Sequence, residues 1–239
     1  MKAMIISDLH YDKRVYDGID QSKAWNWLLG IVEYHKPELL ISLGDWGEAI
    51  NEDELYELLK KVRVWSIYGN HENLEVLKNV YNVLTENREP ILMRDGEIRE
   101  FAGLRFGAIN GIIALRRKER KGIPRKRPEE FIEYGKRLSG KVDVLLLHES
   151  PWIEEYKGVI ARDERTSAVA IAIHEARPKL VFCGHLHLSP YIVYKFEYGT
   201  LYIRIDSSQK HRCYAVFYPN SRKLEVWKDF NVTYETEKF

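Results

Sequence analysis

The sequence predicts an α/β fold in which two packed mixed β-sheets are flanked by helices. Short apolar runs alternate with helical patterns as far as Tyr81, which is typical of parallel strands joined by helices. From Pro90 the runs shorten and are separated by Asp95-Gly96 and Gly103, which favours antiparallel hairpins. Alternating runs between Tyr191 and Trp227 indicate a β meander, and we expect it to complete a second sheet.

Helices are expected where a capping residue or a proline precedes an apolar pattern of helical spacing. The residues that mark these starts are Ser22, Asn51, Asn73, Pro128 and Thr166. The helix after Ser22 should end before Pro37 and cross between two parallel strands. These helices alternate with the strands, so they should cover the faces of the sheets.

Composition favours one α/β domain spanning residues 1–239, because 239 residues with 45% hydrophobic content can bury a large core. We expect it to carry an exposed basic loop at 116–128 and the C-terminal β meander at 190–230. The formal charge of +1 argues against an overall electrostatic attraction of the protein to nucleic acid or to a membrane. Two cysteines, no signal-peptide pattern and no membrane-length apolar run favour a cytoplasmic protein without membrane contact. The oligomeric state stays open.

Five predicted strands end on side chains that can bind a metal ion. The residues at these ends are Asp8 and His10, Asp45, Asn70 and His71, His148, and His185 and His187. Open α/β sheets place their ligands at the carboxyl ends of strands, so we expect these side chains to form one site.

Carboxylate, carboxamide and imidazole donors suit divalent first-row metals. Without His71, seven such donors remain and exceed what one ion needs, and two ions that share a carboxylate form the usual clamp for displacement at phosphorus. We therefore expect two divalent ions, with manganese as first choice and Fe, Ni, Co or Zn as alternatives.

The motifs occur in an order that resembles the calcineurin-like metallophosphoesterase superfamily. They are Asp8-x-His10, Gly44-Asp45-x-x-Glu48, Gly69-Asn70-His71-Glu72, His148 and Gly184-His185-x-His187. The resemblance implies a four-layer α/β/β/α sandwich and two metal sites bridged by Asp45. It assigns one ion to Asp8, His10 and His187, and the other to Asn70, His148 and His185.

The same resemblance makes His71 the catalytic residue that protonates the leaving oxygen or steadies the transition state. The family tetrapeptide commonly ends in Asp, whereas this chain has Glu72. We expect the longer carboxylate to orient His71. Glu48 is either a supporting residue or a solvated turn residue.

The expected reaction is hydrolysis of a phosphate ester by a hydroxide that bridges the two ions. A phosphodiester is slightly preferred, because the chain combines His71 with a potential lid over residues 149–165. The alternatives are a nuclease, a phosphomonoesterase or protein phosphatase, and a non-catalytic scaffold. The intact ligand series argues against the scaffold.

Residues 116–128 are densely basic and lack apolar periodicity, which favours an exposed loop. This loop is either a solvated surface or a contact for a nucleic-acid backbone, where each neutralised phosphate adds salt-sensitive affinity. Loss of cleavage on neutralising Arg125, Lys126 and Arg127 would indicate the nuclease.

Three further residues are candidate substrate contacts. Arg14 lies in the loop after the first strand, Asn110 ends an apolar run, and Arg162 lies in the expected lid.

Overall fold

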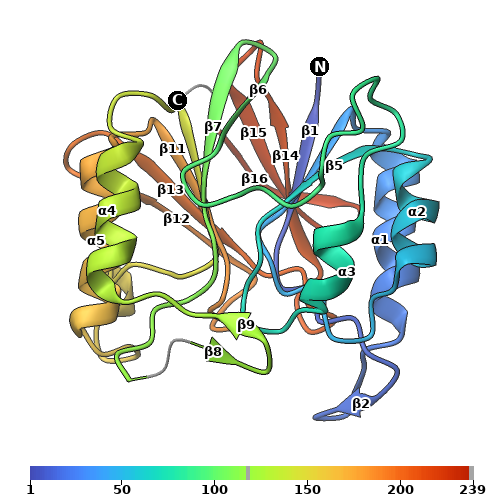
Figure 1. The fold of residues 1–239 in the computed structure, drawn as a ribbon, viewed down its shortest axis with the longest axis horizontal. Helices are drawn as coiled ribbons and strands as arrows, with labels where there is room; N and C mark the ends of the chain where they lie inside the picture. The colour runs from blue at the N-terminus through green and yellow to red at the C-terminus, as the bar shows by residue number, and fades with distance from the viewer. Residues whose placement is uncertain (117–118, 237–239) are drawn as a thin grey trace.

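The computed structural model describes residues 1–116 and 119–236 and shows two six-stranded mixed sheets (Figure 1). The first sheet has the order β16-β15-β14-β1-β4-β5, with β1 (Ala3–Ile6), β4 (Leu39–Ser42), β5 (Arg63–Ser66), β14 (Cys213–Tyr218), β15 (Lys223–Lys228) and β16 (Asn231–Thr236). The second has the order β12-β13-β11-β10-β7-β6, with β6 (Ile98–Phe101), β7 (Leu104–Ile109), β10 (Val144–Leu147), β11 (Leu180–Cys183), β12 (Tyr191–Lys195) and β13 (Leu201–Ile205). The predicted fold class is confirmed.

Alternation along the strands divides the core into layers. Ile5 and Ile41 lie in the core between the two sheets, whereas their neighbours Met4 and Leu40 face the helices on the outer side. Helices α1 (Lys23–His35), α2 (Glu52–Leu59) and α3 (Leu74–Asn79) cover the first sheet. Helices α4 (Pro128–Arg137) and α5 (Glu164–Ala176) cover the second, on the left of Figure 1. The layers are therefore helix, sheet, sheet and helix.

The capping residue of α2 is the one expected from the sequence, whereas the capping residue of α5 is a different one. The Asn51 side chain accepts a hydrogen bond of 2.9 Å from the Glu54 N–H, and together they form a capping box at the expected helix start. Helix α5 is capped by Asp163, which accepts a 3.0 Å bond from the N–H of Thr166. Thr166 is therefore the third helical residue rather than the cap.

The C-terminal meander is divided between the two sheets, so the expectation that it completes a second sheet is correct for its first two strands and wrong for the others. Only β12 and β13 join the second sheet, where β13 pairs in parallel with β11. Strand β14 crosses to the first sheet and pairs antiparallel with β1, and β16 adds an edge strand that the sequence pattern does not predict. The connection after β13 therefore passes between the sheets, close to the predicted ligands.

Two small hairpins lie at the lower edge of Figure 1. They are β2 (Val15–Tyr16) with β3 (Ile19–Asp20), and β8 (Glu119–Arg120) with β9 (Ile123–Pro124). A short 3-10 helix, η1 (Glu154–Tyr156), interrupts the expected lid. Arg117 and Lys118 of the predicted basic loop lie outside the described residues. In the part of the chain that is described, no helix has the length and apolarity needed to cross a membrane.

Candidate metal centre

The predicted ligands follow the carboxyl ends of parallel strands. Strands β1, β4 and β5 are parallel to one another, as are β10 and β11. Asp8 and His10 follow β1, Asp45 follows β4, Asn70 and His71 follow β5, His148 follows β10, and His185 and His187 follow β11. The fold therefore delivers all eight side chains to the same edge of the molecule.

The backbone is strained where four of these side chains leave their strands. Asp8, His10, Asp45 and His185 have φ values of 58°, 48°, 56° and 70°, in the left-handed region. Each such residue costs about 1–2 kcal/mol when it carries a side chain. Strain of this kind concentrates at functional sites, where the surrounding structure holds it in place.

One group of donors consists of Asp8, His10 and His187. Their ligand atoms all lie within 4.8 Å of one another. The Nε2 atoms of His10 and His187 are 3.1 Å apart, and they lie 3.9 Å and 3.8 Å from Asp8 Oδ1. Two imidazoles and a carboxylate at this spacing form a divalent-metal site of the expected kind.

Asp45 lies between two histidines. Its Oδ2 atom is 3.5 Å from Nε2 of His10 and 3.5 Å from Nε2 of His148. Its Oδ1 atom accepts the backbone N–H groups of Asn70, at 2.6 Å, and of His71, at 2.8 Å. One carboxylate oxygen is thus held by the chain, while the other faces donors on both sides.

His185 lies beside His148 and is fixed through its backbone. The ring centroids of the two histidines are 5.1 Å apart. The His185 N–H donates to Asp8 Oδ1 at 3.1 Å and to Oδ2 at 2.9 Å, and its Nε2 lies 3.7 Å from Glu149 Oε1. The seven predicted metal ligands therefore surround one region of the structure.

The donor set fits metal ions, because two of its buried atoms have no partner. Within the described part of the chain, neither Asn70 Oδ1 nor His148 Nε2 has a hydrogen-bond partner. Buried polar atoms are almost always satisfied, so each of these calls for a ligand outside the chain. An amide oxygen and a neutral imidazole nitrogen both bind divalent first-row metals.

Two of the predicted histidine ligands, His148 and His187, are oriented by partners at their Nδ1 atoms. His148 Nδ1 lies 2.8 Å from the backbone oxygen of Leu43, and His187 Nδ1 lies 2.8 Å from Oδ2 of Asp206. A proton on Nδ1 leaves Nε2 free to bind a metal. Asp206 was missed in the sequence, although it follows the apolar run Leu201–Ile205 and so obeys the same strand-end pattern.

The carboxylates make this site attractive to positive charge. Burial lowers the pKa of His148, but the negative charges of Asp45 and Asp8 outweigh it and raise the pKa to about 10. Burial also lowers the pKa of His187, but the hydrogen bond to Asp206 and the charge of Asp8 outweigh burial, so the pKa of His187 is raised. A divalent cation supplies the positive charge that these surroundings favour.

Glu72 does not have the expected contact with His71. Its carboxylate is buried and accepts backbone N–H groups from Asp45 at 2.5 Å, Trp46 at 3.1 Å and Gly69 at 3.0 Å. Burial and the Asp45 charge raise the pKa of Glu72 to about 8 against the opposing effect of these donors. The longer carboxylate therefore ties the Asp45 loop to the Gly69 loop and leaves the His71 ring to other neighbours.

His71 is exposed at the edge of the site. Its ring centroid lies 5.2 Å from that of His10, and its backbone is fixed by the bond to Asp45. An exposed imidazole at this position can exchange protons with solvent and with a bound ligand.

The three candidate substrate contacts differ in their surroundings. Arg14 is 75% exposed at its side chain and pairs with Asp12 at 2.6 Å. Arg162 is also exposed and lies 5.0 Å from the ring of Trp152. Asn110 is buried, accepts the Tyr68 N–H at 2.9 Å and donates to the Met93 oxygen at 3.0 Å, so its side chain supports the core.

Most described residues of the basic segment are exposed as expected, but Ile123, Lys126 and Pro128 are buried. Ile123 packs with Tyr68 and Leu74, and the Nζ atom of Lys126 lies 2.9 Å from Asp95 Oδ2. Lys126 also donates to the Asn110 oxygen at 2.6 Å. These anchors hold the β8–β9 hairpin against the residues that lead into Asn70.

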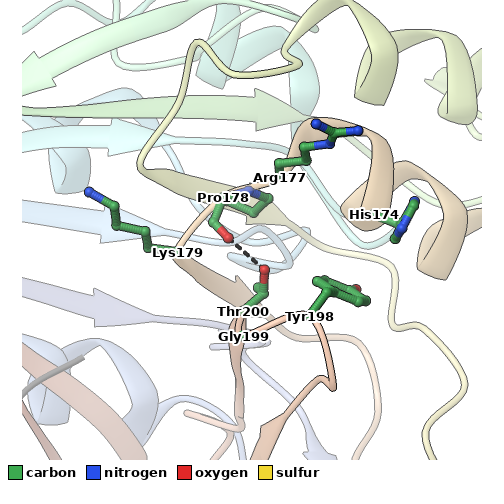
Figure 2. Close-up of a pocket in the computed structure, with 7 residues that line it drawn as sticks. All are labelled: His174, Arg177, Pro178, Lys179, Tyr198, Gly199 and Thr200. Carbon is green, nitrogen blue, oxygen red and sulfur yellow. Dashed lines mark hydrogen bonds between the residues drawn. The ribbon is translucent and has the colours of Figure 1, made fainter.

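A separate hollow of about 450 Å³ lies at the other end of β11 (Figure 2). It is lined by His174, Arg177, Pro178, Lys179, Tyr198, Gly199 and Thr200. Within it, the Thr200 hydroxyl donates to the Pro178 oxygen at 2.6 Å. Because Pro178 and Lys179 precede β11 and His185 follows it, this hollow is distinct from the ligand cluster.

Several solved structures share the fold. One is TT1561 of Thermus thermophilus, which is 14% identical with a TM-score of 0.67 and is matched over 95% of this chain and 98% of that one. A dimetal phosphatase from Danio rerio is 11% identical with a TM-score of 0.60, covering 97% of each chain. GAP50, the anchor in the inner membrane complex of Plasmodium, is 10% identical with a TM-score of 0.56, covering 99% of this chain and 87% of that one. A search of curated proteins found no match.

The family comparison covers most of the chain, including every predicted ligand. Residues 1–189 match the calcineurin-like phosphoesterase family. The Asp and His groups described above supply the divalent metal centre that such chemistry needs. The chain therefore belongs to the calcineurin-like phosphoesterase family and is a metal-dependent hydrolase of phosphate esters.

Proposed function

We propose that the protein is a phosphodiesterase that works with two divalent ions, with manganese as the first choice. One ion would be held by Asp8, His10 and His187, and the other by Asn70, His148 and His185. Asp45 would contribute to both. When bound, the ions supply Lewis acidity toward the phosphate and an activated water as nucleophile.

The observation that carries this proposal is the pair of unsatisfied atoms beside Asp45. Asn70 Oδ1 and His148 Nε2 are buried without a partner among the described residues, and Asp45 Oδ2 lies 3.5 Å from both His10 and His148. A scaffold that binds no ions would gain stability by satisfying or removing these polar atoms. Their retention favours a working metal centre over the scaffold alternative.

His71 supports an ester with an unactivated alkoxide leaving group as substrate. An alkoxide is a poor leaving group, so its departure is accelerated when a nearby acid protonates the oxygen. His71 is exposed at the edge of the site, and its backbone bond of 2.8 Å to Asp45 fixes it relative to the ligands. We assign the leaving-group proton to the His71 ring.

A substrate panel tests the proposal. Purified protein loaded with Mn, Ni or Zn is assayed with bis-p-nitrophenyl phosphate, p-nitrophenyl phosphate and a phosphoserine peptide. We expect the diester to have a kcat/KM about 10-fold above both monoesters, corresponding to about 1.4 kcal/mol. A higher value for p-nitrophenyl phosphate or the peptide would indicate the phosphomonoesterase or protein phosphatase instead.

A nuclease is the second candidate, because the basic β8–β9 hairpin is anchored next to the residues that precede Asn70. Lys126 is unsuitable for the neutralisation test, since its ammonium group is buried against Asp95. The exposed Arg120 and Arg127 are the appropriate residues to replace with Gln. A nuclease should lose cleavage of single- or double-stranded nucleic acid in these variants and in high salt, whereas cleavage of bis-p-nitrophenyl phosphate should persist.

A further inference from the structure

The β8–β9 hairpin has a strained lysine at its tip. Lys121 and Gly122 join the two strands and have φ values of 52° and 74°. Two positive φ values define the tight type I′ connection, for which Asn, Asp and Gly are the favoured residues at the first position. Lysine is therefore an unfavourable choice on backbone grounds, and a side-chain role accounts for it better than the turn does.

The hairpin is anchored through its second strand, β9, and the residues that follow it. Ile123 is buried against Tyr68 and Leu74. Lys126 donates its N–H to the Ile112 oxygen at 3.0 Å and accepts the N–H of Ala114 at 2.9 Å. Since Tyr68 lies two residues before Asn70, these contacts place the hairpin beside the loop that carries His71.

At the tip, Lys121 reaches the rim of the metal centre. Its Nζ atom lies 2.8 Å from Oε1 of Glu48. Glu48 follows Gly47, whose N–H donates to the His71 oxygen at 3.1 Å. Lys121 most strongly lowers the pKa of Glu48, and His71 and Arg14 contribute in the same direction, so Glu48 lies near all three side chains.

The ion pair is open to exchange. The side chains of Lys121 and Glu48 are 65% and 40% exposed, and pairs this exposed contribute little to stability. A phosphate group carries more charge and more acceptor atoms than a carboxylate, so it can replace Glu48 as the partner of the ammonium group.

We propose that Lys121 binds a second phosphate group of the substrate, on the leaving-group side at His71. The inference rests on the proposed function, because the leaving-group side is defined by the role assigned to His71. The ligand class is a phosphate ester that carries a second phosphate on its leaving group, and both a nucleoside bisphosphate and the next phosphate of a strand offer this chemistry. Glu48 keeps the lysine at the rim when no such group is bound.

The test is a binding comparison between matched ligands. Thymidine 5′-monophosphate and thymidine 3′,5′-bisphosphate are titrated calorimetrically into the manganese-loaded protein. We expect the bisphosphate to bind about 10-fold more tightly at low salt, which is the size of one charge-assisted contact. The preference should diminish as NaCl is added.

The decisive variant is Lys121→Asn, because asparagine favours this backbone conformation while removing the charge. We expect its melting temperature to be unchanged and its preference for the bisphosphate to fall to about 2-fold or less, and Lys121→Arg should retain the preference. Lys60→Asn is the matched control, because Lys60 also forms an exposed 2.8 Å pair, with Glu57 at the far end of α2. A Lys121→Asn protein that keeps the full preference, or loses affinity for both ligands equally, overturns the inference.

Two further measurements are needed. One tests this inference separately from the proposed function, and the other identifies the source of the second phosphate. Turnover of bis-p-nitrophenyl phosphate, which has no second phosphate, reports the diesterase activity independently of Lys121. Two thymidine dinucleotides, one with a terminal phosphate and one without it, are each tested as competitors of the bisphosphate. Competition that depends on the terminal phosphate and on Lys121 identifies a strand as the source, and competition by the bisphosphate alone identifies a small molecule.

Discussion

The Nδ1 atom of His187 lies 2.8 Å from Oδ2 of Asp206, which comes from the connection between the two sheets. Asp206 is buried and also accepts the N–H of Ser208 at 2.9 Å through its other oxygen. The carboxylate therefore fixes both the tautomer and the angle of a metal-binding imidazole. The crossing from β13 to β14 thus serves the site as well as the fold.

Asp206→Asn should weaken metal binding without abolishing the fold. The amide keeps the shape of the side chain but lowers the basicity of His187, so we expect the affinity for Mn²⁺ to fall by about 10-fold or more. Calorimetric titration of the apoprotein measures it. Asp143→Asn is the control, because Asp143 is bonded to Arg105 before β10, away from the ligands. Equal Mn²⁺ affinities for Asp206→Asn and the unmodified protein would rule out this role.

Gly69→Ala should displace two of the predicted metal ligands, Asp45 and His148. A Cβ atom at Gly69 would collide with Asp45 Oδ1 and would come within 2.6 Å of His148 Nε2. We expect metal content and diesterase activity to fall by about 100-fold or more, because ligand positions tolerate little displacement. Gly30→Ala is the matched control, since Gly30 lies within α1 and has open space around its Cβ position. Full activity in Gly69→Ala would show that the Asp45 and His148 positions are not critical.

His71→Gln should separate leaving-group protonation from metal binding. We expect unchanged metal content, a loss of about 100-fold or more in kcat for a dinucleotide, and a smaller loss for bis-p-nitrophenyl phosphate. The difference arises because p-nitrophenolate leaves without protonation. His174→Gln, in the hollow of Figure 2, is a control with no expected effect. Equal losses on both substrates would argue against proton donation by His71.

His35 should make the fold sensitive to acid. Burial and the charge of Lys2 lower the pKa of His35 to about 4 from 6.5, and its Nε2 lies 2.9 Å from the Tyr214 hydroxyl. The unfolded chain therefore binds this proton more readily, so the contribution to stability is complete above pH 6.5 and is lost as the pH falls toward 4. Between pH 8 and pH 5 the loss is about 2 kcal/mol.

Urea unfolding of the wild type and of His35→Gln at both pH values isolates this contribution. The glutamine can retain a hydrogen bond to Tyr214 but does not titrate, so its stability should decline less on acidification. Parallel declines in the two proteins would show that His35 does not control the acid response.

Much of the site follows from one rule about strand ends. Asp8, Asp45, His148 and His185 could be predicted because each follows an apolar run, and parallel strands bring such ends together. Asp206 obeys the rule but was missed, because strand β13 was expected in a β meander, whereas it pairs in parallel with β11. The partition of that meander depends on pairing between β14 and β1, which are about 200 residues apart and share no local signal.

Charge patterns were less informative than apolar ones. The basic segment predicts exposure, yet Lys126 is buried because Asp95 and the Asn110 oxygen compensate its ammonium group. Similarly, Glu72 could be recognised as a carboxylate near His71, but its three backbone partners come from loops that meet only in the folded chain. Such contacts depend on tertiary structure, which a linear pattern does not contain.

The most direct test of the metal centre is the manganese content of the wild type and of Asp45→Asn, measured by mass spectrometry after equilibration with Mn²⁺ and gel filtration. Asparagine keeps an acceptor for the N–H groups of Asn70 and His71 but removes the negative charge that faces His10 and His148. We predict about two ions per wild-type chain and fewer than about one per Asp45→Asn chain. Equal content in the two proteins, or a wild type that retains no manganese, would contradict a paired site bridged by Asp45.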